Sequence, residues 1–583
     1  MESNTNNAEI RNSRLGEGDN KEKCQEAILS DEYLDLLVEY EDIEDIYEQY
    51  NPVCIQIIND QFAVVHIKVF EDCSGILSKV NLSGVPHVFG PYATSALDDA
   101  GILTFHDQPY VPLRGEGVLI GIVDSGIDYT NDIFKYEDNT TKIISIWDQT
   151  IEEGPSPEGF IYGTEYREED INKALQSENP REIVKTVDET GHGTFLAGVA
   201  AGRSDESNGF VGAAPDASIA VVKLKEAKKC LKEFYLLEDV DSVYQSTDVI
   251  LAAKYLREKS AQLQMPFVLI IGLGSNQGAH DGSSITESYL GTIATRTGNA
   301  VTVAAGNESN SAHHYRGQFN EGDRQKNIEI KVGENEKGFT FDIWSNAPDK
   351  ISLSVTSPTG EVIDRIPATL TQKEEVKFVL ENTTIYIEYQ LSEGRTGDEV
   401  IFVRMEQPTE GIWTFSIYGD LIINGRFDVW LPRKDWVEEG TVFLQPDPYT
   451  TITDPSSSLG LITAGAYNHE TGSLYLASGR GLTRDDVQKP DLVAPGVGVI
   501  GPRPNNRYGP MTGTSISAAI TGGAAALLLE WGIIKGNDPA MDTGKIRNYL
   551  IRGATRKRLI KYPNSEWGYG ELNLLGAFEA IRG

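Results

Sequence analysis

Apolar residues recur along this chain with several different spacings, and each change of spacing marks a boundary between regions. Residues 1–23 are rich in Asn, Glu, Ser and Gly and hold few apolar side chains. Because such a segment cannot bury enough surface to become ordered, we expect a flexible leader. Residues 27–50 show a helical pattern among acidic residues, and residues 53–58 and 62–67 indicate a strand pair around an Asn-Asp turn. We therefore predict a small α+β unit over residues 24–94.

In residues 95–318 short apolar runs alternate with helical patterns. This alternation predicts an α/β fold, in which right-handed crossovers build a mostly parallel sheet with helices on both faces. The same signature resumes at residues 459–463. We assign residues 447–583 to the second part of this domain. The expected strands are 118–123, 218–224, 267–273 and 300–304, and the expected helices are 192–201, 247–263 and 284–297.

The intervening residues, 319–446, have a different character. Apolar and polar residues alternate there with period two, and turns separate the runs. Many short antiparallel strands predict a β-sandwich or jelly roll inserted into the α/β domain. The expected strands are 328–332, 339–344, 351–355, 385–389, 400–404 and 411–417.

Size and charge narrow the class of protein. A chain of 583 residues is too long for one core, so extra domains must surround any catalytic one. The net charge of -36 argues against nucleic acid and against anionic membrane surfaces, because both are polyanions. Carboxylates could bind calcium, but no run has the spacing of an EF-hand loop. Structural calcium stays possible but is not indicated, and we assign no metal ligand.

The start of the chain is polar, and no apolar stretch approaches the roughly 18 residues of a membrane span. We expect no signal peptide, no membrane span, and a protein that is cytoplasmic at synthesis. The cysteines are too few and too scattered for a disulfide framework in a chain of this size. We expect reduced thiols at Cys24, Cys54, Cys73 and Cys230.

Three distant segments carry the residue types that acyl transfer needs. Asp124, His192 and Ser515 each lie on a glycine-rich turn beside an apolar run. A serine hydroxyl is a weak nucleophile, so it needs an imidazole to take its proton and a carboxylate to fix the imidazole tautomer. Each motif alone is more often a turn, a bend or a helix cap. Together, in this order and on fitting local structure, they predict a nucleophilic triad.

The order Asp, His, Ser and the motifs around these residues resemble those of the subtilisin-like serine proteases. The resemblance implies a subtilisin-like fold and an endopeptidase that acts on a protein or peptide through an acyl-enzyme, with no cofactor required. Asn307 resembles the asparagine of this family that donates to the oxyanion, beside the Ser515 backbone N–H. The alternative for Asn307 is a turn or helix-cap residue. The sequence also resembles the family's substrate-cleft strands, where a peptide can pair as an added strand, at Gly272, Leu273, Gly274, Ala304, Ala305 and Gly306.

The N-terminal unit resembles a propeptide that assists folding and then inhibits the enzyme. A small, flexible linker follows it, as expected for a segment that is cut. We predict that the enzyme cuts this linker itself and that the released propeptide stays bound. The cleavage region comprises Tyr92, Ala93, Thr94, Ser95 and Ala96.

Finer details are similar to the Csp-type germination proteases of spore-forming clostridia. These details are the opening of the propeptide, the β-rich insertion after Asn307, and Ala519, where many subtilases have proline. The resemblance implies activation of a spore-cortex-lytic pro-enzyme and an association with the spore. Some members have lost the triad and act as germinant sensors, so a silent pseudoprotease is the alternative.

Other candidate residues are weaker. His313 and His314 could bind a metal, but adjacent histidines on a strand face opposite ways. His280 and Asp281 either line the site or hold a loop by hydrogen bonds. Cys230 has no histidine nearby in the sequence, so we expect an inert thiol.

Overall fold

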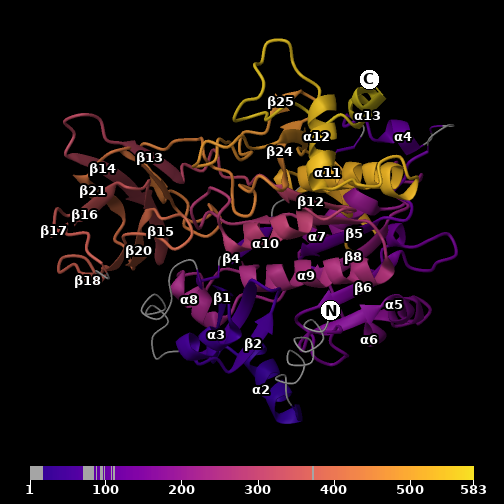
Figure 1. Ribbon diagram of the computed structural model, residues 1–583, viewed down its shortest axis with the longest axis horizontal. Coiled ribbons are helices and arrows are strands. Elements are labelled where there is room, and N and C mark those ends of the chain that lie inside the picture. Colours follow the sequence, from indigo (N-terminus) through magenta and orange to yellow (C-terminus); the bar gives the residue numbers. More distant parts are fainter. Residues whose placement is uncertain are drawn as a thin grey trace, which may run out of the picture.

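A computed structural model of the chain describes residues 17–69, 84–86, 88–91, 96–97, 99–106, 108, 112–370 and 373–582. Figure 1 shows three parts: an indigo N-terminal unit, a central α/β domain, and a β-sandwich at the left.

The central sheet has nine strands, and most of them are parallel as the alternating pattern predicted. Their order is β25-β24-β12-β10-β5-β8-β6-β7, with β26 paired to β24. All described pairings among these strands are parallel except those of β7 and β25, which lie at the two ends. The strands are β5 (Leu119–Asp124), β6 (Ile143–Asp148), β7 (Thr164–Arg167), β8 (Ser218–Lys223), β10 (Phe267–Ile271), β12 (Asn299–Ala304), β24 (Ile462–Asn468), β25 (Ser473–Leu474) and β26 (Leu492–Pro495).

Helices cover both faces of this sheet, and each face has its own apolar core. In Figure 1, α11 and α9 lie on opposite sides of it. One face carries α7 (His192–Ala201) and α11 (Thr514–Leu529), and the other carries α9 (Ser246–Leu263) and α10 (Ile285–Ala294). The other helices of this domain are α4 (Leu103–His106), α5 (Glu168–Leu175), α6 (Pro180–Ile183), α8 (Lys229–Phe234), α12 (Thr543–Gly553) and α13 (Leu574–Arg582).

The expectation that no apolar stretch approaches the length of a membrane span was wrong. The helical stretch Thr514–Ile534 has 21 residues and a mean hydropathy of 1.5, so it is long and apolar enough to cross a membrane. However, 89% of its apolar window is buried inside the protein. A core helix of a large domain needs apolar residues all round, which explains this composition.

The N-terminal unit is a three-stranded antiparallel sheet with two helices. The expected strand pair is present as β2 (Cys54–Ile57) and β3 (Phe62–Lys68), and β1 (Tyr33–Glu39) pairs on the other side of β3. The predicted helix over residues 27–50 was wrong, because this stretch forms the end of α2 (Glu17–Leu29), then β1, then α3 (Ile43–Tyr50). Residues 17–23, which we assigned to the flexible leader, are helical, since α2 begins at Glu17, and residues 1–16 lie outside the described residues.

The expectation of reduced thiols was wrong for Cys24, Cys54 and Cys230, whereas Cys73 lies outside the described residues. A disulfide joins Cys24 in α2 to Cys54 in β2, whose Cα atoms are 5.0 Å apart. Cys230 is also disulfide-bonded, so it is not the free thiol that we expected. Cys24 and Cys54 are 30 residues apart in the sequence and meet only because α2 packs on the sheet.

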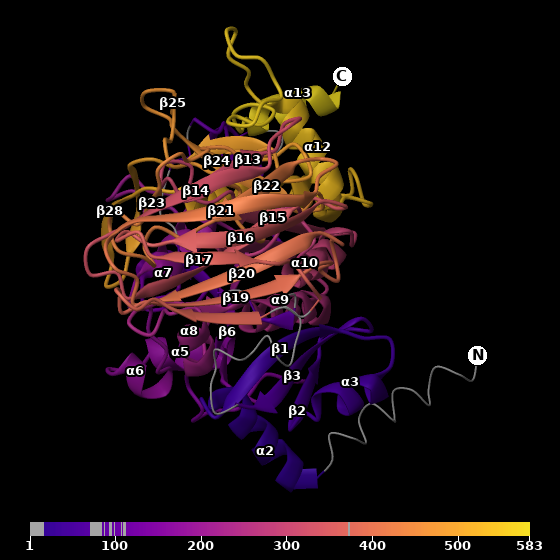
Figure 2. The same ribbon diagram turned by 90° about the vertical axis from the view of Figure 1, so that its left-hand side faces the viewer.

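The inserted region is a sandwich of two antiparallel sheets around a separate apolar core, as predicted. Figure 2 looks at it face on. One sheet has the order β13-β22-β15-β20-β19-β18 and the other β17-β16-β21-β14-β23. The strands are β13 (His314–Gln318), β14 (Gln325–Val332), β15 (Gly338–Ser345), β16 (Lys350–Thr356), β17 (Val362–Ile366), β18 (Lys373–Lys377), β19 (Thr384–Gln390), β20 (Glu399–Glu406), β21 (Gly411–Leu421), β22 (Arg426–Trp430) and β23 (Val442–Phe443).

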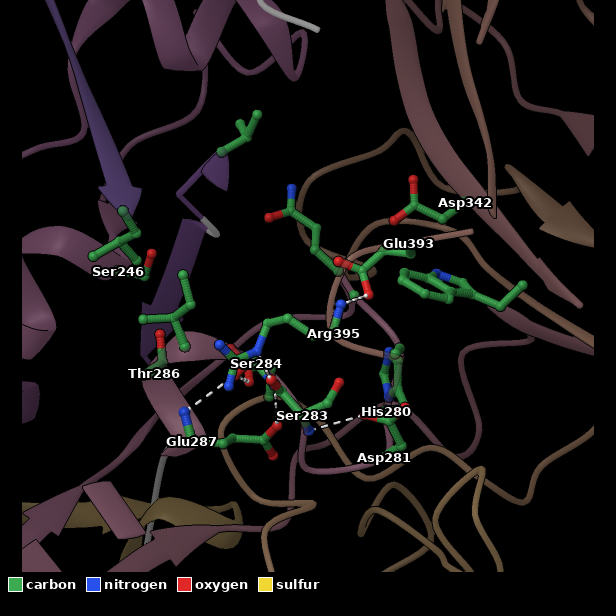
Figure 3. Close-up of a pocket in the computed structure, with 18 of the residues that line it drawn as sticks. Ser246, His280, Asp281, Ser283, Ser284, Thr286, Glu287, Asp342, Glu393 and Arg395 are labelled. Atoms are coloured by element: carbon green, nitrogen blue, oxygen red, sulfur yellow. Dashed lines mark hydrogen bonds between the residues drawn. The ribbon is translucent and has the colours of Figure 1, made fainter. Parts of the chain in front are cut away.

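The three parts meet around Arg395 of the sandwich. Figure 3 shows this junction, which encloses a cavity of about 50 Å³. Arg395 donates to the carbonyl oxygen of Ser283 at 2.5 Å and to Ser288 Oγ at 2.6 Å, both in the α/β domain. Its Nη1 atom lies 2.7 Å from a carboxylate oxygen of Glu39 in the N-terminal unit. One side chain therefore ties the insertion to both other parts.

Candidate active site

The fold brings together the three residues of the predicted triad. Asp124 is the last residue of β5, His192 is the first residue of α7, and Ser515 is the second residue of α11. His192 Nδ1 lies 2.8 Å from Asp124 Oδ1, and His192 Nε2 lies 3.2 Å from Ser515 Oγ. All three side chains are buried. This is the arrangement in which an imidazole takes the serine proton while a carboxylate fixes its tautomer.

A second carboxylate, which the sequence analysis missed, holds His192 in place. Asp188 accepts hydrogen bonds from the backbone N–H groups of Gly191 at 2.9 Å and Thr194 at 2.8 Å. It also accepts from the Thr194 hydroxyl at 2.6 Å. These donors surround the start of α7, where backbone N–H groups have no partner within the helix. An Asp four residues before the histidine is the local signal that could have revealed it.

Ser125 links the two carboxylates. Its hydroxyl oxygen lies 3.1 Å from Asp124 Oδ1 and 2.8 Å from Asp188 Oδ1, and its backbone N–H donates to Asp124 Oδ1 at 2.8 Å. Thr190 Oγ1 donates to the same hydroxyl at 2.8 Å. The orientation of Asp124 is thus fixed by neighbours other than His192.

Glycine at two positions lets the backbone approach the reacting groups. Gly191 has φ 74°, the left-handed region, and directly precedes His192. At Gly272 a Cβ atom would lie 2.9 Å from the Cβ of Ser515 and 3.4 Å from Cε1 of His192. Any side chain at Gly272 would therefore displace the triad. This explains the glycine in the expected cleft strand.

Asn307 lies beside Ser515. Its Oδ1 atom accepts from the backbone N–H of Thr514 at 3.1 Å and from the Thr514 hydroxyl at 3.2 Å. With the carbonyl end held in this way, the Nδ2 end is the one that can donate to a substrate. The neighbouring N–H of Gly306 donates to the same hydroxyl of Thr514 at 3.0 Å. The end of β12 therefore contacts the start of α11 through the residues Ala304, Ala305 and Gly306.

Two other groups surround Asn307. Burial raises the pKa of Glu308 to about 7, and its Oε2 atom accepts from the backbone N–H of Lys434 at 3.2 Å. Lys434 Nζ donates to the carbonyl oxygen of Asn307 at 3.1 Å. The sandwich end therefore contacts the turn that carries Asn307.

A strand from the N-terminal part of the chain already pairs with the expected cleft strand. β4 (Val88–Pro91) is antiparallel to β11 (Leu273–Gly274), with Pro91 opposite Leu273 and Gly90 opposite Gly274. On its other edge, β4 pairs with β9 (Tyr244–Gln245). An extended peptide bound between two strands is a common mode of peptide recognition. Of the predicted cleavage region, residues 92–95 lie outside the described residues, and Ala96 is buried.

The remaining histidine candidates have structural surroundings. His280 lies between the carbonyl oxygens of Ile452 at 2.6 Å and Asn276 at 3.0 Å, so it holds a loop. His313 bonds the carbonyl oxygen of Pro432, and His314 bonds Asp428. Burial lowers the pKa values of His280 and His313 to about 4. Within the described part of the chain, no three His, Cys, Asp or Glu residues are grouped to hold a metal ion.

The sequence and structure of this chain are similar to those of known proteins. The sequence model of the Subtilase family (Peptidase S8) matches residues 115–362 and 445–570. The solved structure of the Clostridium perfringens CspB protease matches 84% of this chain and 98% of that chain, with 32% sequence identity and a TM-score of 0.75.

The curated relatives are more distant and much longer. The PII-type proteinase of Lactococcus lactis subsp. cremoris is 23% identical over 475 residues, and that of Lacticaseibacillus paracasei is 22% identical over 478 residues. Each alignment takes in 72% of this chain and 23% of the relative, so the chain spans about a quarter of their length. The family match encloses Asp124, His192 and Ser515 and extends over more than half of the residues. The chain therefore belongs to the Subtilase family.

Proposed function

We propose that this protein is a serine endopeptidase that cuts peptide bonds through an acyl-enzyme. The observation that carries the proposal is the continuous contact from Asp124 through His192 to Ser515, at 2.8 and 3.2 Å. In this mechanism Ser515 Oγ attacks the peptide carbonyl while His192 Nε2 takes its proton. His192 then gives the proton to the leaving amine, and water hydrolyses the acyl-enzyme by the reverse sequence.

The developing oxyanion needs donors that are in place before the reaction. We assign this role to Asn307 Nδ2 and to the backbone N–H of Ser515. Ser515 is at the start of α11, where N–H groups point out of the helix end. The fixed Oδ1 atom of Asn307 supports the assignment, because it sets which end of the amide faces the cleft.

We further propose that the enzyme processes itself. β4 lies on β11 in the manner of a substrate strand, and Pro91 is followed at once by the linker residues 92–96. The N-terminal unit is then a propeptide that remains bound after the cut, since Arg395 and Lys228 hold it to the rest of the protein. We also propose a germination role, with a spore-cortex-lytic pro-enzyme as the substrate. This role rests on the resemblance of the sequence to the Csp-type germination proteases, and the similarity in structure to the CspB protease supports that resemblance.

A fluorophosphonate probe and Ser515→Ala test the catalytic proposal together. The wild-type protein should be labelled at Ser515, appear as two fragments, and lose both properties in Ser515→Ala. Thr521→Ala, which removes a hydroxyl bonded within α11, is the matched control and should retain both. An unlabelled wild-type protein, with its cleft opened by removal of the N-terminal unit, would favour the pseudoprotease alternative.

The germination role has a separate test. The purified wild-type protein and Ser515→Ala are each incubated with the candidate pro-enzyme, and the products are identified by mass spectrometry. Specific cleavage by the wild type alone supports this substrate. An active enzyme that leaves the pro-enzyme intact would contradict the germination role without affecting the catalytic proposal.

A further inference from the structure

A second cavity, of about 740 Å³, opens next to the triad. One wall is the loop of residues 187–190 that precedes His192. The other wall is the hairpin formed by β27 (Val499–Arg503) and β28 (Arg507–Met511), which leads directly into α11. The two walls touch beside the triad, since a Cβ atom on Gly191 would lie 2.7 Å from Pro504.

Arginines line this cavity in a chain whose net charge is -36. Arg503 donates to the carbonyl oxygen of Pro510 at 2.8 Å, and Arg507 donates to that of Pro504 at 3.3 Å. Within the described residues, neither of them forms an ion pair. A third lining arginine, Arg181, reaches Asp128 at 3.4 Å. Burial and then Arg507 lower the pKa of Arg503, which indicates crowding of like charges.

The acidic groups of the cavity already have partners. Asp188 accepts from the start of α7, as described above, and Glu189 lies 2.8 Å from Lys223 Nζ. The positive charge of Arg503 and Arg507 is therefore not neutralised by the carboxylates of their own cavity.

The hairpin is held in a fixed position. The backbone N–H of Asn505 donates to Asp128 Oδ2 at 2.7 Å, and Asn131 Nδ2 donates to the carbonyl oxygen of Arg503 at 3.0 Å. Anchored arginines lose less side-chain freedom on binding than mobile ones, so they suit the recognition of a carboxylate.

The pairing of β4 indicates where the acyl half of a substrate would lie. The acyl half of a substrate occupies the place of β4, between β9 and β11. β27 and β28 form a separate two-stranded sheet and pair with none of these strands. The hairpin faces the loop that precedes His192 across the cavity, so it lies outside the sheet that would hold the acyl half and is free to meet the leaving half.

We propose that Arg503 and Arg507 select substrates with acidic side chains shortly after the scissile bond. The inference rests on the proposed peptidase function and adds a substrate class to it. The chain's own sequence fits this class, since the predicted cleavage region is followed by Asp98 and Asp99. In the structure the Tyr467 hydroxyl donates to Asp99, so the carboxylates would meet the arginines only while this segment occupies the cleft; within the described residues, Arg503 and Arg507 have no acidic partner.

Three synthetic peptides spanning residues 86–102 test the preference. One has the natural sequence, one carries Asp98→Asn with Asp99→Asn, and one carries lysine at both positions. For two partly exposed ion pairs at low salt we expect kcat/KM to be about five- to tenfold higher for the acidic peptide than for the amide peptide. The lysine peptide should be the poorest. Raising the salt concentration should shrink these ratios, because it screens exposed charges.

In the double variant Arg503→Gln/Arg507→Gln, the ratio of kcat/KM for the acidic peptide to that for the amide peptide should fall close to one. The control Arg558→Gln, which changes a remote and exposed arginine, should leave this ratio at the wild-type value. Equal rates for all peptides with wild-type enzyme would overturn the inference and leave the peptidase proposal standing. If wild type cleaves none of the peptides because its own β4 fills the cleft, the rate of self-processing is the readout. Slower self-processing in the double variant would support the inference, and an unchanged rate would overturn it. Wild-type protein that neither cuts its own chain nor is labelled at Ser515 would overturn the proposed function itself.

Discussion

At the scale of single residues, Asn307 offers a sharp test of how the site works. Removing its donor should weaken binding of the transition state more than binding of the substrate. We expect Asn307→Ala to lower kcat by about 10² to 10³ with little change in KM. Steady-state kinetics on a peptide ester would measure this, and a rise in KM at constant kcat would point to a different oxyanion donor.

Asp188 is a positioning residue, since it contacts none of the reacting atoms. Asp188→Ala would leave the N–H groups of Gly191 and Thr194 without their acceptor and would loosen the start of α7. Because a displacement of about 1 Å can cost roughly 10²-fold in rate, we expect a loss of that order. Glu189→Ala removes a more exposed carboxylate from the same loop and should have a much smaller effect.

The readout that separates positioning from general destabilisation is the probe reaction. In Asp188→Ala, Ser515 should react slowly with a fluorophosphonate at temperatures where circular dichroism still shows a folded protein. Normal labelling, with only a lower melting temperature, would mean that Asp188 contributes stability alone.

The sequence predicted the three residues that meet at the site, because each lies in a short motif with a glycine-rich turn. It did not predict Ser125 and Asp188 as their supports. Those roles depend on hydrogen bonds between segments 63 residues apart, and an aspartate or serine in a loop has many other uses. Arg503 and Arg507 were not predicted for the same reason, since their exposure, and their lack of an ion pair with any residue that the structure describes, are properties of the folded chain.

At the scale of elements, strands and helices of the α/β domain were predictable because their apolar runs are bounded by clear turns. The predicted helix 192–201 coincides with α7. The pattern in the N-terminal unit was ambiguous. In residues 33–39, with the sequence YLDLLVE, the order of apolar and polar residues fits either a helix or a strand. The segment forms a strand because it pairs with β3.

The strand β1 carries a buried charge cluster that should make the N-terminal unit sensitive to acid. Asp35 Oδ1 lies 2.6 Å from His66 Nδ1 and 2.5 Å from Lys228 Nζ of the α/β domain. Burial lowers the pKa of His66 from 6.5, against the opposing effect of Asp35. Burial would raise the pKa of Asp35, but Lys228 and His66 hold it well below its usual range.

Both shifts have the same consequence for stability. The unfolded unit takes up protons at His66 below pH 6.5 and at Asp35 below about pH 4, whereas the folded unit does not, so stability falls as the pH falls. We expect hydrogen exchange in β1–β3 to be slow at pH 7.5, faster at pH 5.5 after correction for intrinsic rates, and fastest near pH 4. His66→Gln should abolish the first step and keep the second. Equal protection at pH 7.5 and 5.5 in wild type would contradict this account.

At the scale of the whole molecule, the family match omits residues 363–444, which form much of the sandwich. The period-two pattern predicted this part as a β-domain, but it could not show how the sandwich is joined to the rest. Trp344, Phe402 and Trp430 of the sandwich share one apolar cluster with residues of the N-terminal unit and of the α8 region. Such contacts between distant segments have no local sequence signal.

Arg484 should decide whether the sandwich and the α/β domain unfold together. Its side chain is fully buried, and it bonds Asp281 and the carbonyl oxygen of Ala279 in one domain and Asn346 and Asp398 in the other. Arg484→Met would leave two buried carboxylates without their counter-ion, which costs about 3 to 5 kcal/mol. Arg365→Met, which breaks a more exposed pair with Asp420 inside the sandwich, should cost about 0 to 1 kcal/mol.

We expect calorimetry to show one unfolding transition for wild type and for Arg365→Met, and an earlier, separate transition of the sandwich for Arg484→Met. Limited proteolysis should then cut the sandwich first in Arg484→Met alone. Equal melting temperatures for the two variants would mean that the apolar cluster, and not this charge network, joins the domains.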